Sequence, residues 1–166
     1  MLATIMNAAV LRDYLRAEGV KAAVMTPREY APLTREFTRD LAMPMLKSGT
    51  VLIFGGGAGN PFFTTDSAAA LRALEIQADA LLKGTQVDGV YDKDPHSHPD
   101  AVRFDSLSYA EVIDRRLGVM DLTAIALCEE RGVPIEVFDI SEPENLLAVL
   151  AGDRPGTRIA KEQRDA

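Results

Sequence analysis

The chain has a single cysteine, no tryptophan, and fewer basic than acidic residues. Its 18 Lys and Arg against 25 Asp and Glu give a net charge of −7, which disfavours a nucleic-acid polymer or an anionic membrane as partner, because both attract basic surfaces. One cysteine cannot form an internal disulfide, and Cys128 ends an apolar run typical of a buried helix face. We therefore expect a packed thiol rather than a nucleophile.

Long hydrophobic runs are also missing. No apolar stretch approaches the roughly 20 residues that a membrane helix needs, and the N-terminus has neither the basic start nor the small-residue cleavage site of a signal peptide. We expect a cytoplasmic protein.

The residues that are present predict an α/β fold. With 47% apolar residues, the 166-residue chain can bury one ordinary core, so a single domain over 1–160 and a loose, charged tail over 161–166 are expected. Apolar spacing predicts strands that alternate with helices, the pattern of a mostly parallel sheet covered on both faces. The expected helices are 2–18, 33–46 (interrupted or ended near Pro44), 67–77, 109–114, 121–131 and 143–150; the expected strands are 20–25, 51–54, 80–83 and 135–138.

A glycine-rich loop, Phe54 to Asp66, follows the strand predicted at 51–54 and precedes a helix. Its four glycines, 55, 56, 57 and 59, permit positive φ and let an anion approach the backbone N–H groups. One of its two threonines is expected to cap the helix. The alternative is a turn that only reverses the chain, but the segment Asn60-Pro61-Phe62-Phe63 places two aromatics where a base or ribose could be held.

A second candidate site follows the strand predicted at 80–83. Lys83 and Thr85 lie at the carboxyl end of that strand, where ligands of open parallel sheets bind. Tyr91 can lie against an adenine ring, and Asp94 can accept hydrogen bonds from a ribose or a base. In the alternative interpretation, Tyr91 is a half-buried strand residue and Asp94 begins an Asp-Pro turn.

Two further carboxylates begin helices. Asp66 and Asp121 each have a sufficient explanation as helix-terminal charges, and a functional role would require both to face the same phosphates, where they could position Mg²⁺. His96 and His98 are expected in a solvated loop, so we predict no protein metal site. The sequence contains no Ser-His-Asp arrangement, no Cys-x-x-Cys pair and no Walker-type motif.

Several segments together resemble the bacterial uridylate kinases of the amino-acid kinase superfamily. They are Met1-Leu2-Ala3-Thr4-Ile5-Met6-Asn7-Ala8, Gly59-Asn60-Pro61-Phe62-Phe63-Thr64-Thr65-Asp66, Val87-Asp88-Gly89-Val90-Tyr91, Asp94-Pro95 and Val119-Met120-Asp121. The resemblance runs in order over nearly the whole chain. It implies a three-layer α/β/α sandwich that transfers the γ-phosphoryl group of ATP to UMP with Mg²⁺. It also implies a homo-oligomer, a hexamer of dimers in the family, with GTP and UTP as effectors.

The resemblance also implies roles for particular residues. Lys83, Asp66 and Asp121 correspond to residues near the transferring phosphoryl group, and Thr85, Tyr91 and Asp94 to ATP contacts. The UMP-binding loop corresponds to Ala58, Gly59, Asn60, Pro61, Phe62, Phe63, Thr64 and Thr65. Two positions depart from the family: Ala58 replaces a common threonine, and Gln86 a frequent lysine.

The largest departure is at the front of the chain, which lacks the family's Lys-x-Ser-Gly-Glu phosphate loop and its Gly-Gly-Gly-Asn turn. We hypothesise that the chain corresponds to the C-terminal two-thirds of a uridylate kinase and is catalytically weak or inactive alone. Three interpretations stay open: a kinase whose start codon lies upstream, a non-catalytic paralogue that binds nucleotide or joins kinase hexamers, and a phosphotransferase acting on a carboxylate or carbamate. Codons upstream of Met1 would separate the first two, and the Asn60 to Phe63 segment disfavours the third.

Overall fold

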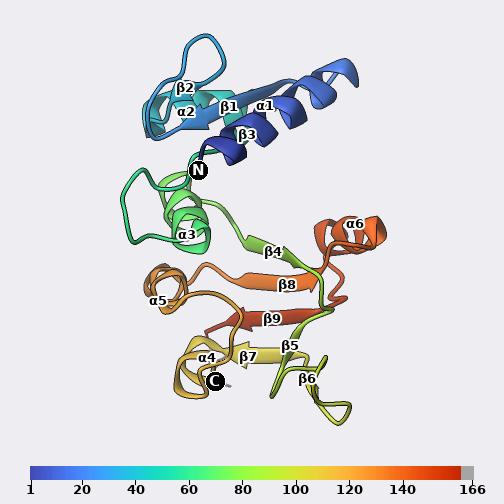
Figure 1. Cartoon of the computed structure of the whole chain (residues 1–166). Helices are drawn as coiled ribbons and strands as arrows, with labels where there is room; N and C mark the ends of the chain where they lie inside the picture. The colour runs from blue at the N-terminus through green and yellow to red at the C-terminus, as the bar shows by residue number, and fades with distance from the viewer. Residues whose placement is uncertain (162–166) are drawn as a thin grey trace. The chain divides into compact units, whose positions relative to one another are not determined.

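The computed structural model describes residues 1–161, and the chain forms two compact units, Met1–Ile76 and a second beginning at Gln77 (Figure 1). Each unit is described by itself, and the single domain expected over 1–160 stays a prediction. The predicted tail at 161–166 lies outside the described residues, apart from Lys161. Within the described part, none of the helices has the length and apolar character needed to cross a membrane.

The first unit is a three-stranded parallel sheet with its helices. Its strands pair in the order β2-β1-β3, and both pairings are parallel, so the carboxyl ends of all three strands lie at one edge. Helix α1 contacts β1 and β3 and buries Ile5 and Ala8. The elements are α1 (Leu2–Ala17), β1 (Ala22–Thr26), β2 (Arg35–Glu36), α2 (Arg39–Lys47), β3 (Val51–Phe54) and α3 (Thr65–Glu75).

The helix predicted at 33–46 is wrong in its first part. Arg35 and Glu36 pair with β1, and the hydroxyl of the preceding Thr34 hydrogen-bonds that of Thr26 at 2.7 Å, so strand pairing prevails over helical spacing. Helix α2 begins after Thr38, whose side chain accepts the Leu41 N–H, and it continues through Pro44 to Lys47. An interior proline removes one hydrogen bond and crowds the carbonyl four residues earlier, but the helix continues past it, and the Pro44 carbonyl accepts the N–H of Ser48 at 3.0 Å.

The second unit contains a four-stranded mixed sheet and a separate hairpin. The sheet order is β4-β8-β9-β7, with β4 parallel to β8, β7 parallel to β9, and β8 antiparallel to β9. Strands β5 and β6 form the antiparallel hairpin. The elements are β4 (Leu81–Thr85), β5 (Val90–Tyr91), β6 (Arg103–Phe104), β7 (Ser106–Ser108), α4 (Tyr109–Asp114), α5 (Leu122–Arg131), β8 (Ile135–Asp139), α6 (Pro143–Ala151) and β9 (Thr157–Ala160). The α/β class with mostly parallel strands is confirmed.

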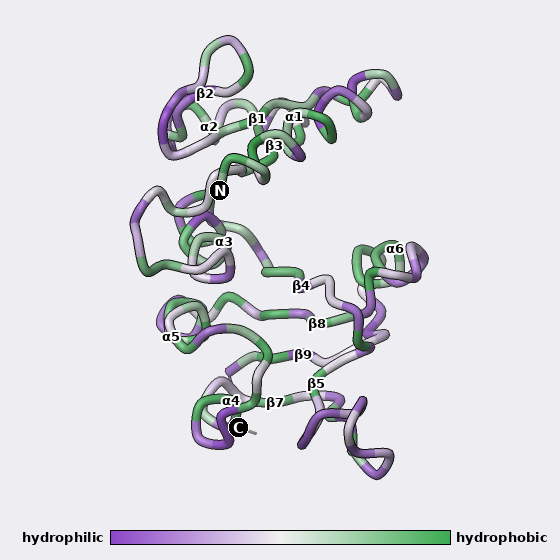
Figure 2. The backbone as a smooth tube through the Cα atoms, viewed as in Figure 1, coloured by the Kyte–Doolittle hydropathy of each residue, from purple (hydrophilic) through white to green (hydrophobic). Residues whose placement is uncertain are grey.

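The core of the second unit gathers around β8. Strand β8 buries Ile135, Val137 and Phe138, and helix α5 buries Ile125 and Cys128. Cys128 is a packed thiol, as predicted, and burial raises its pKa to about 11. Figure 2 shows the hydrophobic residues along β4 and β8, whereas hydrophilic residues dominate around the β5–β6 hairpin. The hairpin buries Val90 and is also held to the rest of the unit by polar contacts of Val90 and Arg103.

Candidate functional site

The glycine loop leaves β3 at the sheet edge where the parallel strands end. Gly56, Gly57 and Gly59 have φ between +70° and +80°, the region that favours glycine. Gly55 lies so close to α1 that a Cβ there would be 3.3 Å from the Cα of Ile5. The N–H of Gly56 donates to the Thr4 hydroxyl at 3.0 Å. The loop is thus anchored to the first turn of α1, as a strand-glycine-helix site requires.

A pocket of about 520 Å³ in the first unit is bounded by this loop, by the start of α1 and by the segment after β1. Among the residues predicted for UMP, Gly59 to Phe63 line it, while Ala58, Thr64 and Thr65 do not. Phe62 is fully exposed and has a φ of +70°. Sequence reasoning missed Pro27, Arg28 and Tyr30, although their position directly after a strand of the same edge was a usable signal.

Thr64 performs the capping role expected of one of the loop's threonines. Its hydroxyl accepts the N–H groups of Asp66 and Ser67 at 3.1 and 3.2 Å and so begins α3. Asp66 lies in the first turn, half-buried, where its charge is favourable at the positive end of the helix dipole.

A second pocket, of about 450 Å³, lies within the second unit and brings together residues predicted from distant parts of the sequence. Lys83 and Thr85 come from β4, in which Lys83 is the middle residue rather than the expected last one and Thr85 ends the strand; Tyr91 comes from β5 and Asp94 from the following loop. The remaining lining residues are Val87, Gly89, Val90, Asp92, Lys93, Pro95, Arg115, Arg116, Leu117, Gly118, Val119 and Val137. Four basic side chains thus line the pocket against two acidic ones, in a chain that is acidic as a whole.

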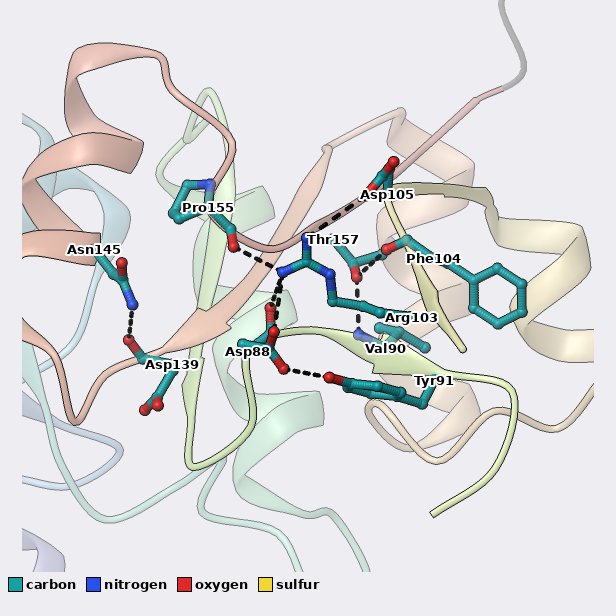
Figure 3. A network of polar contacts seen from close by, with 10 residues as sticks. All are labelled: Asp88, Val90, Tyr91, Arg103, Phe104, Asp105, Asp139, Asn145, Pro155 and Thr157. Carbon is teal, nitrogen blue, oxygen red and sulfur yellow. Dashed lines mark hydrogen bonds and ion pairs between the residues drawn. The ribbon is translucent and has the colours of Figure 1, made fainter. Parts of the chain in front are cut away.

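Two of the predicted residues make local hydrogen bonds. The Tyr91 hydroxyl donates to Asp88 Oδ1 at 2.6 Å, and this bond raises the pKa of Tyr91 (Figure 3). Asp94 accepts the hydroxyl of Ser97 at 2.7 Å and the N–H of His96 at 3.0 Å, and these bonds lower its pKa. Asp94 therefore begins a turn, as the alternative interpretation held, and it also lies on the pocket.

The turn after α4 supplies pocket residues that sequence reasoning missed. Arg115 lies over the Phe104 ring at 5.4 Å and 3.8 Å from Glu111, and Arg116 has a φ of +51°. The sequence feature that could have indicated a basic turn here was Arg115-Arg116-Leu117-Gly118, directly after the short helix at 109–114. Nothing in the sequence indicated that this turn faces the end of β4.

A family model for the amino acid kinase family matches residues 1–139. The chain belongs to the amino acid kinase family. It is 51% identical over 159 residues to the uridylate kinase of Psychrobacter cryohalolentis and 53% identical to that of Stutzerimonas stutzeri. These alignments cover 96% of this chain but only 66% and 64% of the relatives, so the chain spans less than two-thirds of their length.

Solved structures agree with this membership of the amino acid kinase family. The chain superposes on the UMP kinase of Bacillus anthracis with a TM-score of 0.94 at 34% identity, covering 98% of this chain and 67% of that protein. The UMP kinase of Ureaplasma parvum gives 0.92 at 35% identity, covering 97% and 69%. The predicted resemblance to uridylate kinases and the predicted fold class are confirmed.

The last carboxylate predicted for this amino acid kinase site has a structural role. Asp121, half-buried, caps α5 by accepting the N–H of Ala124 at 2.9 Å. Among residues 1–161, no group of three or more acidic, histidine or cysteine side chains could hold a metal by itself. His96 and His98 are exposed in the loop after β5. A cation here would therefore depend mainly on a ligand's own oxygens.

Proposed function

We propose that the protein is a UMP kinase that transfers the γ-phosphoryl group of ATP to UMP and releases UDP. One observation carries the proposal: the second pocket collects Lys83, Thr85 and Tyr91 together with Arg115 and Arg116. An aromatic ring beside several cations suits a nucleoside triphosphate, and the named relatives are uridylate kinases and UMP kinases.

In this proposal the second pocket takes ATP. The Tyr91 ring lies against the adenine, Thr85 donates a hydroxyl, and Lys83 with the two arginines neutralises the phosphates. Phosphoryl transfer depends on positioning and charge neutralisation rather than on a protein nucleophile. The buried, neutral thiol of Cys128 is consistent with that chemistry.

The glycine loop of the first unit takes UMP in this proposal. Its positive-φ glycines expose backbone N–H groups to the UMP phosphate, and the aromatic segment at Phe62 and Phe63 lies beside the same pocket. Each half-buried carboxylate, Asp66 in the first unit and Asp121 in the second, is taken by itself as a candidate Mg²⁺ ligand. This fits the residues present, because Mg²⁺ in kinases needs only one or two carboxylates besides the phosphate oxygens. When bound, Mg²⁺ neutralises charge that develops on the phosphates.

The proposal extends to assembly and location: a cytoplasmic homo-oligomer, a hexamer as in the family, with GTP and UTP as effectors. An exposed apolar surface on helix α1 supports the proposal of a homo-oligomer. Leu2, Met6, Val10 and Tyr14 recur at four-residue spacing, and their exposed fractions are 68, 69, 56 and 72%. An apolar stripe of this kind marks an interaction surface.

The 166-residue chain alone is expected to form UDP slowly, because its sequence contains no Lys-x-Ser-Gly-Glu phosphate loop. Loss of a phosphate-binding group costs on the order of a hundredfold in rate.

Calorimetric titration of the 166-residue chain with ATP and with UMP, paired with a coupled assay for UDP, tests the function. We expect both nucleotides to bind and Lys83→Met to weaken ATP at least about tenfold while UMP binding is unchanged. Arg154→Met, outside both nucleotide pockets, is the matched control. Failure of the chain to bind either nucleotide would overturn the proposal. Binding of both without any UDP formation would favour the non-catalytic paralogue.

A further inference from the structure

The hairpin that carries Tyr91 also contains Arg103, which does not line the second pocket. Figure 3 shows its contacts with Asp88, Asp105 and Pro155. The role inferred for it rests on the proposed function, in which Tyr91 faces the base of ATP. Arg103 lies on β6, directly opposite Tyr91 in the antiparallel pair. It comes from a part of the sequence to which neither the residue patterns nor the resemblance assigned a role.

Arg103 connects three segments of the second unit through one guanidinium group. Its Nη1 donates to Asp88 Oδ2 at 3.1 Å, to the Asp88 carbonyl at 3.3 Å and to the Pro155 carbonyl at 3.1 Å. Its Nη2 lies 3.6 Å from a carboxylate oxygen of Asp105. Such a planar, multiply bonded group fixes direction as well as distance.

The Asp88 carboxylate passes that orientation to the pocket. One of its oxygens accepts from Arg103 and the other accepts the Tyr91 hydroxyl at 2.6 Å. Since both oxygens are engaged, a rotation of the carboxylate breaks one bond or the other. The carboxylate is therefore oriented by Arg103 and in turn holds the phenol.

The backbone around these side chains has little freedom to adjust. A Cβ at Gly89 would lie 2.5 Å from the Thr157 hydroxyl and 2.9 Å from Arg103 Cδ. The buried Thr157 hydroxyl accepts the N–H of Val90 at 2.8 Å. With the strand fixed in this way, the direction of the Tyr91 ring depends on its hydroxyl contact.

The ion pair itself contributes little to stability. The side chains of Arg103 and Asp88 are 31% and 52% exposed, and pairs this exposed contribute weakly to folding. The contact between Arg103 and Asp88 therefore matters for the orientation of the Asp88 carboxylate rather than for the stability of the fold.

We propose that Arg103 is a positioning residue for the ATP base, acting through Asp88 on the ring of Tyr91. Arg103→Met keeps the aliphatic stem and removes every hydrogen bond of the guanidinium. It is expected to weaken ATP binding about threefold to tenfold, the range for one well-formed hydrogen bond, and to leave UMP binding unchanged.

A double-mutant cycle separates positioning from general support of the hairpin. In Tyr91→Phe the hydroxyl is absent, so adding Arg103→Met is expected to cost no further ATP affinity. Equal losses in the two backgrounds would show that Arg103 acts without Tyr91 and would overturn the proposal. Arg154→Met serves as the control for removal of one positive charge from the same unit.

A second readout needs no nucleotide. NMR titration of ¹³C-labelled tyrosines follows the phenol of Tyr91, assigned by its loss in Tyr91→Phe. The hydrogen bond with Asp88 raises the pKa of Tyr91, and the charge of Arg103 lowers it. If Arg103 orients Asp88, Arg103→Met breaks that bond; because the bond affects the pKa of Tyr91 more than the arginine's charge does, the pKa falls. If Arg103 contributes charge alone, the same substitution raises it, which would overturn the proposal.

The ATP titration and the NMR titration together distinguish a failure of the role inferred for Arg103 from a failure of the UMP kinase proposal. A wild-type chain that binds no ATP overturns the UMP kinase proposal and the role of Arg103 in nucleotide binding, while the NMR titration still decides whether Arg103 orients Tyr91. If the wild-type chain binds ATP and Arg103→Met binds it equally tightly, the UMP kinase proposal is unaffected and the positioning role of Arg103 is overturned.

Discussion

Replacing Thr157 with valine tests whether one buried hydroxyl holds the β5–β6 hairpin to the sheet. Thr157 is 1% exposed, and its Oγ1 accepts the N–H of Val90 and donates to the carbonyl of Phe104. Valine has nearly the same shape, so the substitution removes the hydroxyl without opening a cavity. Both backbone groups then lose their hydrogen bond to Thr157 in a place that water does not readily reach.

The cost follows from those two groups. A buried hydrogen bond contributes about 0.5–1.5 kcal/mol, so the loss of two should destabilise the second unit by about 1–3 kcal/mol. With a urea m-value of about 2 kcal/mol per M, the unfolding midpoint falls by about 0.5–1.5 M. Thr157→Ser keeps the hydroxyl and loses one methyl group, which costs about 1 kcal/mol.

Urea titrations of the three proteins, followed by far-UV circular dichroism, supply the comparison. A Thr157→Val unfolding midpoint no lower than that of Thr157→Ser would refute the reasoning. It would mean that removing the hydroxyl costs no more stability than removing the methyl group.

Three further predictions concern other positions. Gly156→Ala places a Cβ 1.9 Å from the carbonyl oxygen of Val137 and should destabilise the protein by about 3 kcal/mol or more, whereas Gly118→Ala, with nothing within 4 Å, should change the urea midpoint little. Asp121→Ala should lose about 1 kcal/mol of stability with the α5 cap, whereas Asp121→Asn should keep that stability. Slow UDP formation by both variants would indicate that the carboxylate also acts on the nucleotide phosphates. Wild-type activity of Asp121→Asn would refute that role. The Cys128 thiol, with a pKa of about 11, should resist alkylation at pH 8. Because its folded pKa lies above the unfolded value of about 8.5, its contribution to stability should be lost as pH rises between the two, and urea midpoints at pH 8 and pH 10 that agree would contradict this.

The sequence predicted those elements that have clear apolar runs or helical spacing. Val51 to Phe54 and Tyr109 to Asp114 have the predicted bounds. The missed strands lack such runs. Strand β2 consists of two exposed charged residues, and the four residues of β9 bury only Thr157 and Ile159, so their assignment depends on partners far away in the chain.

The same limit applies to the candidate sites. Lys83 and Tyr91 could be predicted because each lies in or beside an apolar segment of the sequence, whereas their convergence on one pocket depends on where the separate β5–β6 hairpin packs. The turn at Arg115 and Arg116 could not, since its approach to β4 depends on how α4 packs in the second unit. The ATP contact predicted for Asp94 and the catalytic role predicted for Asp121 both stay predictions. Both make the local hydrogen bonds that turns and helix starts use in any protein.

The position of β9 after every residue that lines the second pocket has a consequence for synthesis on the ribosome. Every residue that lines the second pocket has been made once Val137 is added. The strand that pairs with both β7 and β8 is made later, and the hydroxyl that holds Val90 comes 67 residues after it. A nascent chain interrupted before Thr157 would therefore contain the whole pocket lining without the contact that shapes it, so the nucleotide binding proposed for this unit should appear only after Thr157 has been added.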